Sequence, residues 1–309
     1  MILLWGIPSE TPLAMVHDAL KLRGAPLVLL NQRRFASSDI ALEVSNGLAT
    51  GMLTIDGENY PLTEFSAAYF RPMDHNQLPE IRSLPLTHPE RQRCQTLNEL
   101  LLHWLEILPG RVLNRPEAMG SNMSKPYQMQ LIRELGFAIP ETLITNDPEQ
   151  VLAFHERWGR VIYKSISGVR SIVRELSKAD LTRLDRIRAC PTQFQAYVEG
   201  FDLRIHTIGK RAFATRADTN AADYRYAVRQ PGGNTELEAY QLPLELQQRC
   251  LQLARGLGLD FAGIDLKITP DGEIYCFEVN PCPAYSYYQL NTGQPIAEAV
   301  AEYLSHCAE

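Results

Sequence analysis

The most informative stretch of the chain reads Ala262-Gly263-Ile264-Asp265-Leu266-Lys267-Ile268, then Thr269-Pro270-Asp271-Gly272, then Glu273-Ile274-Tyr275-Cys276-Phe277-Glu278-Val279-Asn280-Pro281. Two apolar runs on either side of a Pro-Asp-Gly turn predict a β-hairpin. A loop of two or four residues places Asp265 directly opposite Glu278, whereas a three-residue loop breaks that register. Because side chains alternate along a strand, Asn280 is expected on the same face as Glu278.

This hairpin predicts a metal site. Directly opposed Cβ atoms lie about 4.5–5.5 Å apart, and like charges at that spacing destabilise a sheet, so a positive charge is expected between the two acids. The opposite face is apolar and is expected to face the core, with Ile264, Leu266, Phe277 and Val279. Carboxylate and amide oxygens suit Mg²⁺, which binds one or two carboxylates plus substrate phosphates. The alternative is a solvent-facing strand pair whose charges are screened.

The composition is that of an ordinary globular protein. The chain has 309 residues, of which 45% are hydrophobic and 21% are charged, which excludes a collagen, a disordered tail protein and a disulfide scaffold. Its 30 Lys and Arg against 36 Asp and Glu give a net charge of −6. Nucleic-acid binding needs clustered cations, so we expect no nucleic-acid partner, although a nucleotide needs only a few local cations.

The cysteines and the apolar runs indicate a cytoplasmic protein. The six cysteines show neither a C-x-x-C pair nor zinc-ligand spacing, which favours free thiols in a reducing compartment. The first residues lack the basic segment of a signal peptide, and their apolar run is too short for one. No segment reaches the about 20 apolar residues of a membrane span, so no membrane partner is expected.

The order of the expected elements predicts an α/β (α+β) fold of two or three parts, the first over residues 1–112. In the first part, strands alternate with helices, which favours a parallel sheet covered by helices. The pattern changes after Arg115-Pro116, so the first boundary is placed near 111–114. Helices are expected over 11–22, 89–108, 125–135, 148 onward, 181–187, 244–257 and 293–306, with Thr11 as a possible cap of the first, and strands over 2–5, 26–30, 52–55, 60–62, 67–70, 141–145, 161–163, 172–173, 194–198, 202–208 and 212–215 besides the hairpin.

Two further segments carry residues suited to a nucleotide. Lys164 closes an apolar strand and precedes the small-residue loop 165–171, whose backbone N–H groups suit a phosphate. Asp202, Arg204 and His206 share one face of another strand. A guanidinium suits phosphate or carboxylate, and Asp202 suits a sugar hydroxyl. The alternatives are an exposed loop with a surface lysine and a solvated strand face.

Several single residues are weaker candidates. Arg71 follows the apolar strand 67–70 and is expected to point into an interdomain cleft, with a surface arginine as the alternative. Arg216 and Arg225 are candidates for phosphate or substrate charge. Three tyrosines near the C-terminus line a pocket or simply pack: Tyr285, Tyr287 and Tyr288.

Together these pieces resemble the ATP-grasp superfamily and, within it, the RimK-like carboxylate–amine ligases. The resemblance runs through residues 112–305 in this order: Lys125 opening a helix, Gly136-x-x-x-Pro140-x-Thr142, Lys164 before its loop, Phe194-Gln195-Ala196-Tyr197-Val198, Asp202-Leu203-Arg204, Ala262-Gly263-Ile264-Asp265 and Phe277-Glu278-Val279-Asn280-Pro281. It implies an ATP-grasp fold of two α+β subdomains, over 113–192 and 193–309, preceded by a Rossmann-like pre-ATP-grasp domain over 1–112. The layout is also similar to the microviridin-type peptide ligases, including Arg71 and the stretch 146–149.

The resemblance implies ATP and Mg²⁺ as cofactors, with two Mg²⁺ ions and Mn²⁺ as an alternative ion. The implied nucleotide contacts are Lys125 and Lys164 to phosphates, Ala196 and Tyr197 at the adenine, Asp202 at the ribose, and Arg225 in a nucleotide-contacting stretch. The implied metal ligands are Asp265, Glu278 and Asn280, with Glu278 bridging the two ions. Arg204 and Arg216 are the expected catalytic cations, and Arg71 and Tyr285 are expected at the substrate.

The implied reaction needs no enzyme nucleophile. A carboxylate attacks the γ-phosphorus of ATP to give an acyl phosphate and ADP, and an amine or hydroxyl then displaces phosphate, so catalysis is positioning and charge neutralisation. The expected substrate is an amino acid, a peptide or a protein terminus. One alternative is a microviridin-type macrocyclase that forms side-chain lactone or lactam bonds, and another is a non-catalytic ATP-binding sensor. The resemblance also implies homo-oligomers.

This sequence departs from RimK itself in two places. The loop after Lys164 lacks several glycines, and Cys282-Pro283-Ala284 stands where a glycine follows the Asn-Pro pair. Both departures bear on loop closure and on the choice of substrate.

Overall fold

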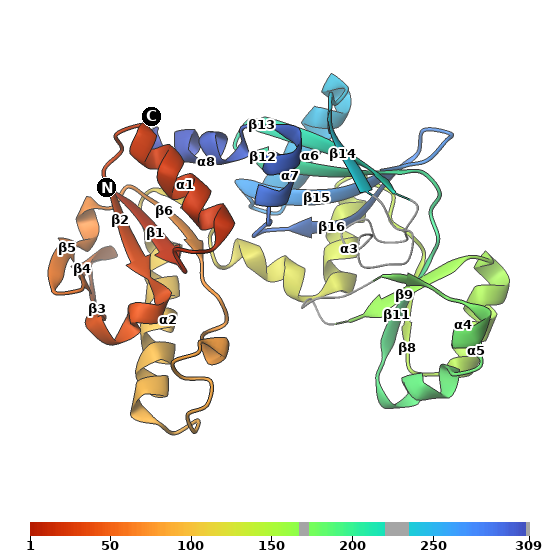
Figure 1. The fold of residues 1–309 in the computed structure, drawn as a ribbon, viewed down its shortest axis with the longest axis horizontal. Coiled ribbons are helices and arrows are strands. Elements are labelled where there is room, and N and C mark those ends of the chain that lie inside the picture. The colour runs from red at the N-terminus through yellow and green to blue at the C-terminus, as the bar shows by residue number, and fades with distance from the viewer. Residues whose placement is uncertain (167–172, 220–234, 307–309) are drawn as a thin grey trace.

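The computed structural model describes residues 1–166, 173–219 and 235–306, whose strands form four β-sheets (Figure 1). The first sheet is parallel, in the order β2-β1-β6-β7. Its strands are β1 (Ile2–Gly6), β2 (Leu27–Asn31), β6 (Ala67–Arg71) and β7 (Arg111–Leu113). Helix α1 (Thr11–Leu22) packs on the face that holds Leu4, and α2 (Pro89–Ile107) packs on the face that holds Trp5. The expected parallel sheet covered by helices is therefore confirmed.

The start of α1 differs by one residue from the expectation. Glu10 occupies the cap position and Thr11 is already helical, so that Pro12 still lies in the first turn. A small antiparallel sheet extends from the first part through β3 (Ser38–Ser45), β4 (Leu48–Ile55) and β5 (Glu58–Pro61). The expected Asp56-Gly57 turn joins β4 to β5, with both residues at positive φ, as a tight hairpin requires.

The middle sheet has the order β10-β9-β11-β8. Its strands are β8 (Thr142–Thr145), β9 (Val161–Ser165), β10 (Arg174–Glu175) and β11 (Thr192–Ala196), and helix α4 (Pro148–Trp158) packs against it. The helix expected over 181–187 was wrong: a capping box between Ser177 and Asp180 starts α5 (Lys178–Leu181) early, and a separate 3₁₀ helix covers Leu184–Ala189. The strand expected at 172–173 lies instead at β10; residue 172 is outside the described residues.

The last sheet is antiparallel, in the order β14-β13-β12-β15-β16. Its strands are β12 (Phe201–Ile208), β13 (Arg211–Thr219), β14 (Thr235–Tyr240), β15 (Phe261–Ile268) and β16 (Ile274–Asn280). Helices α3 (Lys125–Glu134) and α6 (Leu244–Gly256) share one core with this sheet. The expected hairpin of β15 and β16 is confirmed.

Two helices close the described chain where one was expected over 293–306. Gly293, at positive φ, ends α7 (Ser286–Thr292), and Pro295 precedes α8 (Ile296–Ser305). Helix α8 lies beside α1, and its residues Ile296 and Val300 share a core with Leu4 and Tyr69 of the first sheet (Figure 1). The first and last parts of the chain are thus joined by one core.

The division at 112 and 192, and the Rossmann-like likeness of the first part, stay predictions. None of the described helices combines the length and the apolar character needed to cross a bilayer.

Candidate functional site

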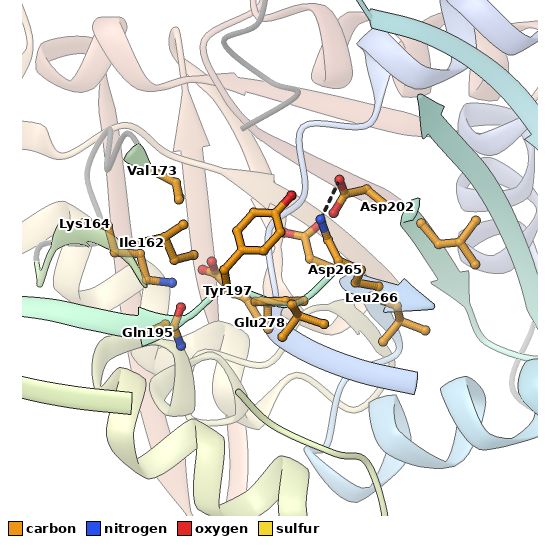
Figure 2. Close-up of a pocket in the computed structure, with 13 residues that line it drawn as sticks. Ile162, Lys164, Val173, Gln195, Tyr197, Asp202, Asp265, Leu266 and Glu278 are labelled. Carbon is orange, nitrogen blue, oxygen red and sulfur yellow. Dashed lines mark ion pairs between the residues drawn. The ribbon is translucent and has the colours of Figure 1, made fainter. Parts of the chain in front are cut away.

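A pocket lies between the middle sheet and the last sheet (Figure 2). It holds about 700 Å³ of space, part of it open solvent. The middle sheet and the segments beside it contribute Ile162, Lys164, Val173, Gln195, Tyr197 and Val198, and the last sheet contributes Asp202, Leu203, Asp265, Leu266, Lys267, Phe277 and Glu278. Five of the residues singled out in the sequence therefore meet in one cavity: Lys164, Tyr197, Asp202, Asp265 and Glu278.

The pairing of Asp265 with Glu278 is confirmed, but by a different route from the one assumed. The hairpin loop is the three-residue type, Pro270–Gly272, closed by a hydrogen bond from the Thr269 amide to the Glu273 carbonyl. That loop pairs Leu266 with Cys276, and a β-bulge at Phe277 then restores the pairing of the two acids.

The bulge also changes which residues face the core. Phe277 and Glu278 are consecutive, yet both line the pocket, while Cys276 and Val279 on either side are fully buried. The expectation that Phe277 belongs to the core was therefore wrong, because the extra residue interrupts the alternation of the strand. Phe277 is instead part of the apolar wall of the pocket.

Each of the two acids binds a cation from a neighbouring element. Lys125, the first residue of α3, forms an ion pair with Glu278 and also lies 3.3 Å from Asn122 Oδ1. Arg204 Nη1 donates to Asp265 Oδ1 at 2.7 Å. The positive charge expected between the opposed acids is thus supplied, in this structure, by two side chains on the acids' flanks.

Helix α3 is fixed to β16 by Gln128. Its side chain, 1% exposed, donates to the Val279 carbonyl at 2.8 Å and accepts from the Val279 amide at 3.0 Å. This two-bond clamp holds Lys125, one turn earlier on α3, in register with Glu278. Sequence reasoning missed Gln128, since nothing in its spacing marks a contact to a strand 151 residues away.

A second pair of charges crosses from β12 to β15 beside Tyr197. Lys267 Nζ lies 3.3 Å from Asp202 Oδ2, drawn as a dashed line in Figure 2. The Tyr197 ring lies between Lys164 and Asp202 in that view, with the Arg160 guanidinium 3.7 Å from its centroid. Lys267 was also missed, although strand alternation places it on the face of Asp265.

The segment that leaves β11 has its backbone tied to the middle part. The Ala196 amide donates to Glu141 O and the Tyr197 amide donates to Arg160 O, both at 2.9 Å. Gln195, 2% exposed, donates to Thr142 Oγ1 at 2.9 Å, and its own Oε1 has no partner among the described residues. This segment therefore forms a firm edge of the pocket.

The remaining candidates lie elsewhere or outside the described residues. Arg216 bonds Asp218 at 3.0 Å and lies over the Phe201 ring, away from the pocket walls that the structure describes. Arg225 and the loop residues 167–171 lie outside the described residues. Asn280 is opposite Gly263, beyond Glu278, and its Oδ1 accepts from the Cys282 amide at 2.9 Å.

The two residues expected at the substrate lie at the contact between the first sheet and the segment after β16. Arg71 donates to both Glu10 carboxylate oxygens at 2.8 and 2.9 Å and to the Pro283 carbonyl at 2.9 Å. Tyr285 is fully buried, and its hydroxyl donates to the Pro12 carbonyl at 2.6 Å. Burial also raises the pKa of the nearby Cys282 thiol, which Arg71 partly offsets. The structure thus places Tyr285 in the core rather than beside the pocket.

The donor set fits Mg²⁺. Two carboxylates paired across strands face one cavity, with an amide oxygen two residues further along the strand, and lysines stand at the same cavity. The described residues contain no group of three or more His, Cys, Asp or Glu that would hold a metal without other ligands. Such a site suits an ion that completes its coordination with phosphate oxygens and water.

Comparison with known proteins identifies a family and similar solved structures. A family model described as the RimK-like ATP-grasp domain matches residues 123–304. A curated relative, a probable alpha-L-glutamate ligase of Ectopseudomonas mendocina (strain ymp), is 22% identical over 220 residues, which cover 68% of this chain and 72% of the relative.

Several solved structures match nearly the whole chain, and two of them are PsnB and MdnC. The ATP-grasp ligase PsnB, complexed with a phosphomimetic variant of a minimal precursor, Mg and ADP, has a TM-score of 0.78 and 26% identity, covering 98% of this chain and 97% of its own. The macrocyclase MdnC from Microcystis aeruginosa MRC, bound with precursor peptide MdnA, has a TM-score of 0.79 and 25% identity, covering 98% of each chain. The expected ATP-grasp fold is thereby confirmed.

Proposed function

Because this chain belongs to the RimK-like ATP-grasp family, we propose that it is an ATP-dependent ligase that joins a carboxylate to an amine through an acyl phosphate. The observation that carries the proposal is the pairing of Asp265 with Glu278 on one wall of a pocket whose opposite wall holds Lys164. This arrangement offers hard oxygen ligands on one side and a phosphate-binding cation on the other.

The residues at the pocket divide between the nucleotide and the metal. Lys164 and Lys125 are proposed to bind phosphate oxygens, and Tyr197 and Asp202 to bind the nucleoside. Asp265, Glu278 and Asn280 would hold Mg²⁺, which supplies charge neutralisation on the transferring phosphoryl group. Binding requires Lys125 to turn from Glu278 toward the phosphates, because the ion and the ammonium compete for the same carboxylate.

Arg204 is the proposed catalytic cation. Its guanidinium is held at Asp265, where charge would develop on the acyl phosphate and its leaving phosphate. Arg216 has less support, since it is engaged by Asp218 away from the described pocket walls. The number of metal ions and assembly into homo-oligomers stay predictions.

We propose a peptide as the carboxylate substrate. The solved structures of PsnB and MdnC, each of which covers 98% of this chain, hold a minimal precursor variant and a precursor peptide, whereas the glutamate ligase match covers 68% of it. The coverage also favours the second candidate, a macrocyclase that joins side chains of one peptide by lactone or lactam bonds. An amino acid acceptor, as the name of the curated relatives suggests, is the competing substrate class.

Hydroxylamine trapping tests the proposal. The protein is incubated with ATP, Mg²⁺ and hydroxylamine, together with acidic peptides or free glutamate. A ligase forms ADP and a hydroxamate only with its own carboxylate, because hydroxylamine intercepts the acyl phosphate. The matched control replaces the peptide's Asp and Glu by Asn and Gln. Absence of ADP and hydroxamate with every carboxylate, together with tight ATP binding, would favour the non-catalytic sensor instead.

A further inference from the structure

The guanidinium of Arg204 is buried at the edge of the pocket, where Asp265, His206 and Gly263 lie close to it. The side chain is 6% exposed, although arginine normally keeps its charged end in water. Its Nη1 donates to Asp265, its Nε lies 3.4 Å from His206 Nε2, and the Tyr288 ring centroid lies 5.7 Å from its Cζ. A buried, multiply held arginine has little freedom to choose another position.

Gly263 lies directly against the Arg204 guanidinium. It is the Cα partner of His206 on β12 and of Asn280 on β16, so it lies at the centre of the three strands. A Cβ at position 263 would lie 2.1 Å from Arg204 Nη2 and 2.6 Å from Cζ, closer than real Cβ contacts allow. The backbone of Gly263 is outside the left-handed region, so space for the guanidinium, and not conformation, requires a glycine here.

His206 lies beside Nε of Arg204. The ring is fully buried, and its Nε2 faces the Arg204 N–H, so it accepts and the proton is assigned to Nδ1. Nδ1 has no partner among the described residues. A buried imidazole with one unpaired nitrogen is less favourable than an apolar side chain, unless its other nitrogen serves a purpose. Orienting Arg204 is the contact that provides one.

We propose that Gly263 and His206 are positioning residues that together fix the guanidinium of Arg204 beside Asp265. The proposal rests on the proposed function, in which Arg204 stabilises charge on the acyl phosphate. Because Gly263 has no side chain, the guanidinium can lie close to β15, and His206 fixes its rotation by accepting a hydrogen bond from Nε–H. With both in place, Nη1 meets Asp265 without reorganisation when charge develops in the pocket.

The first test adds a Cβ at position 263, which displaces the Arg204 guanidinium. Gly263→Ala is expected to lower kcat about 10–100-fold and to change the KM for ATP by less than about threefold, because the misplaced cation acts in the transition state and not in nucleotide binding. Gly120→Ala is the matched control, since a Cβ there meets nothing within 4 Å, and it should leave both constants unchanged. Equal kcat in the two variants would overturn the role of Gly263.

The second test alters the acceptor. His206→Gln keeps an acceptor near the position of Nε2, whereas His206→Met has similar length and only the weak acceptor of a thioether sulfur. The Met variant is expected to lose kcat about tenfold and the Gln variant to recover most of it. Equal losses in the two variants would assign His206 a packing role and overturn its positioning role.

A double-mutant cycle with Arg204→Met separates positioning from other effects. If Gly263 acts through Arg204, Gly263→Ala causes no further loss of kcat in the Arg204→Met background. A full further loss would show that the alanine acts through Pro283, whose Cβ would lie 2.7 Å from it.

A readout without turnover keeps the inference separate from the ligase proposal. The Nε–H resonance of Arg204 in ¹⁵N-arginine-labelled protein, assigned by its loss in Arg204→Met, should shift and broaden in Gly263→Ala and His206→Met but not in Gly120→Ala. An unchanged resonance would overturn the inference even in an active enzyme. A changed resonance in a protein that forms no ADP would support the positioning of Arg204 by Gly263 and His206, and it would count against the proposed function.

Discussion

Two buried arginines of this molecule each form an ion pair with a carboxylate, but the surroundings of the two pairs differ. Arg204 pairs with Asp265 with its side chain 6% exposed, and Arg71 pairs with Glu10 with its side chain 7% exposed. The carboxylate of the first pair lines a pocket beside a second carboxylate, whereas Arg71 continues to the Pro283 carbonyl and joins two distant segments. Burial and pairing alone therefore do not mark a site; the neighbours of the pair do.

The comparison predicts where each region is sensitive. The contact around Arg71 should act on stability, because it ties the first sheet to the segment after β16, next to the Tyr285 bond to Pro12. Substitution of Asp265 or Glu278 should instead lower turnover, because both carboxylates line the pocket that we propose binds ATP and Mg²⁺.

The largest effect is expected at Glu278. Glu278→Gln keeps the shape of the side chain but removes the charge that we propose binds Mg²⁺, so ADP formation should fall about 10³-fold. Circular dichroism should stay unchanged. Glu302→Gln, at an exposed pair with Arg211, is the control and should keep full turnover. Near-normal activity of Glu278→Gln would remove the metal assignment.

The next effect separates the two arginines directly. Arg71→Met leaves Glu10 and the Pro283 carbonyl without their donor and should lower the free energy of unfolding by about 2–3 kcal/mol, less than for a fully buried pair because Glu10 is one-third exposed. Urea denaturation measures it, with Arg211→Met at an exposed pair expected within about 0.5 kcal/mol of wild type. A stable Arg71→Met that loses only peptide turnover would restore the substrate role expected from the sequence.

A smaller effect is expected at Lys164. Lys164→Ala removes a cation from the pocket wall and should raise the Kd for ATP about tenfold, or about 1.4 kcal/mol. Isothermal titration calorimetry measures it. Lys210→Ala, in an exposed turn, is the control. Equal ATP affinity in the two variants would contradict the phosphate role of Lys164.

The last effect concerns the pH dependence of stability. Burial, and after it the charge of Arg204, holds the pKa of His206 well below its ordinary value of 6.5. The unfolded chain therefore takes up a proton at this histidine below about pH 6.5 while the folded protein does not, so its contribution weakens the fold as pH falls. Relative to His206→Met, wild type should lose at most about 1.4 kcal/mol per pH unit between pH 6.5 and 5. Parallel stability profiles of the two proteins would contradict this.

The sequence predicted most of what is local. Alternation and turn residues located four of the five described strands of the last sheet, with β14 not expected, and the cross-strand pair of Asp265 and Glu278 was correct. The reasoning about loop length was nevertheless wrong, since a three-residue loop and a bulge at Phe277 compensate each other. A bulge leaves no signal in the order of apolar and polar residues, so its position was not predictable.

Contacts between distant segments were not predictable from one sequence. Glu10 and Arg71 are 61 residues apart, and Lys125 and Glu278 are 153 apart. Each residue reads as an ordinary charge in its own surroundings, and only the folded chain selects its partner. The closing helices show the same limit at short range, because Gly293 and Pro295 are small signals against a long apolar pattern.

The extra residue in β16 has a consequence for how the pocket can change. Because Phe277 and Glu278 are adjacent in the chain and share a direction, the hydrophobic lining and the acid are coupled through a single peptide unit. A substitution at position 277 that moves this peptide unit would therefore also move the Glu278 carboxylate.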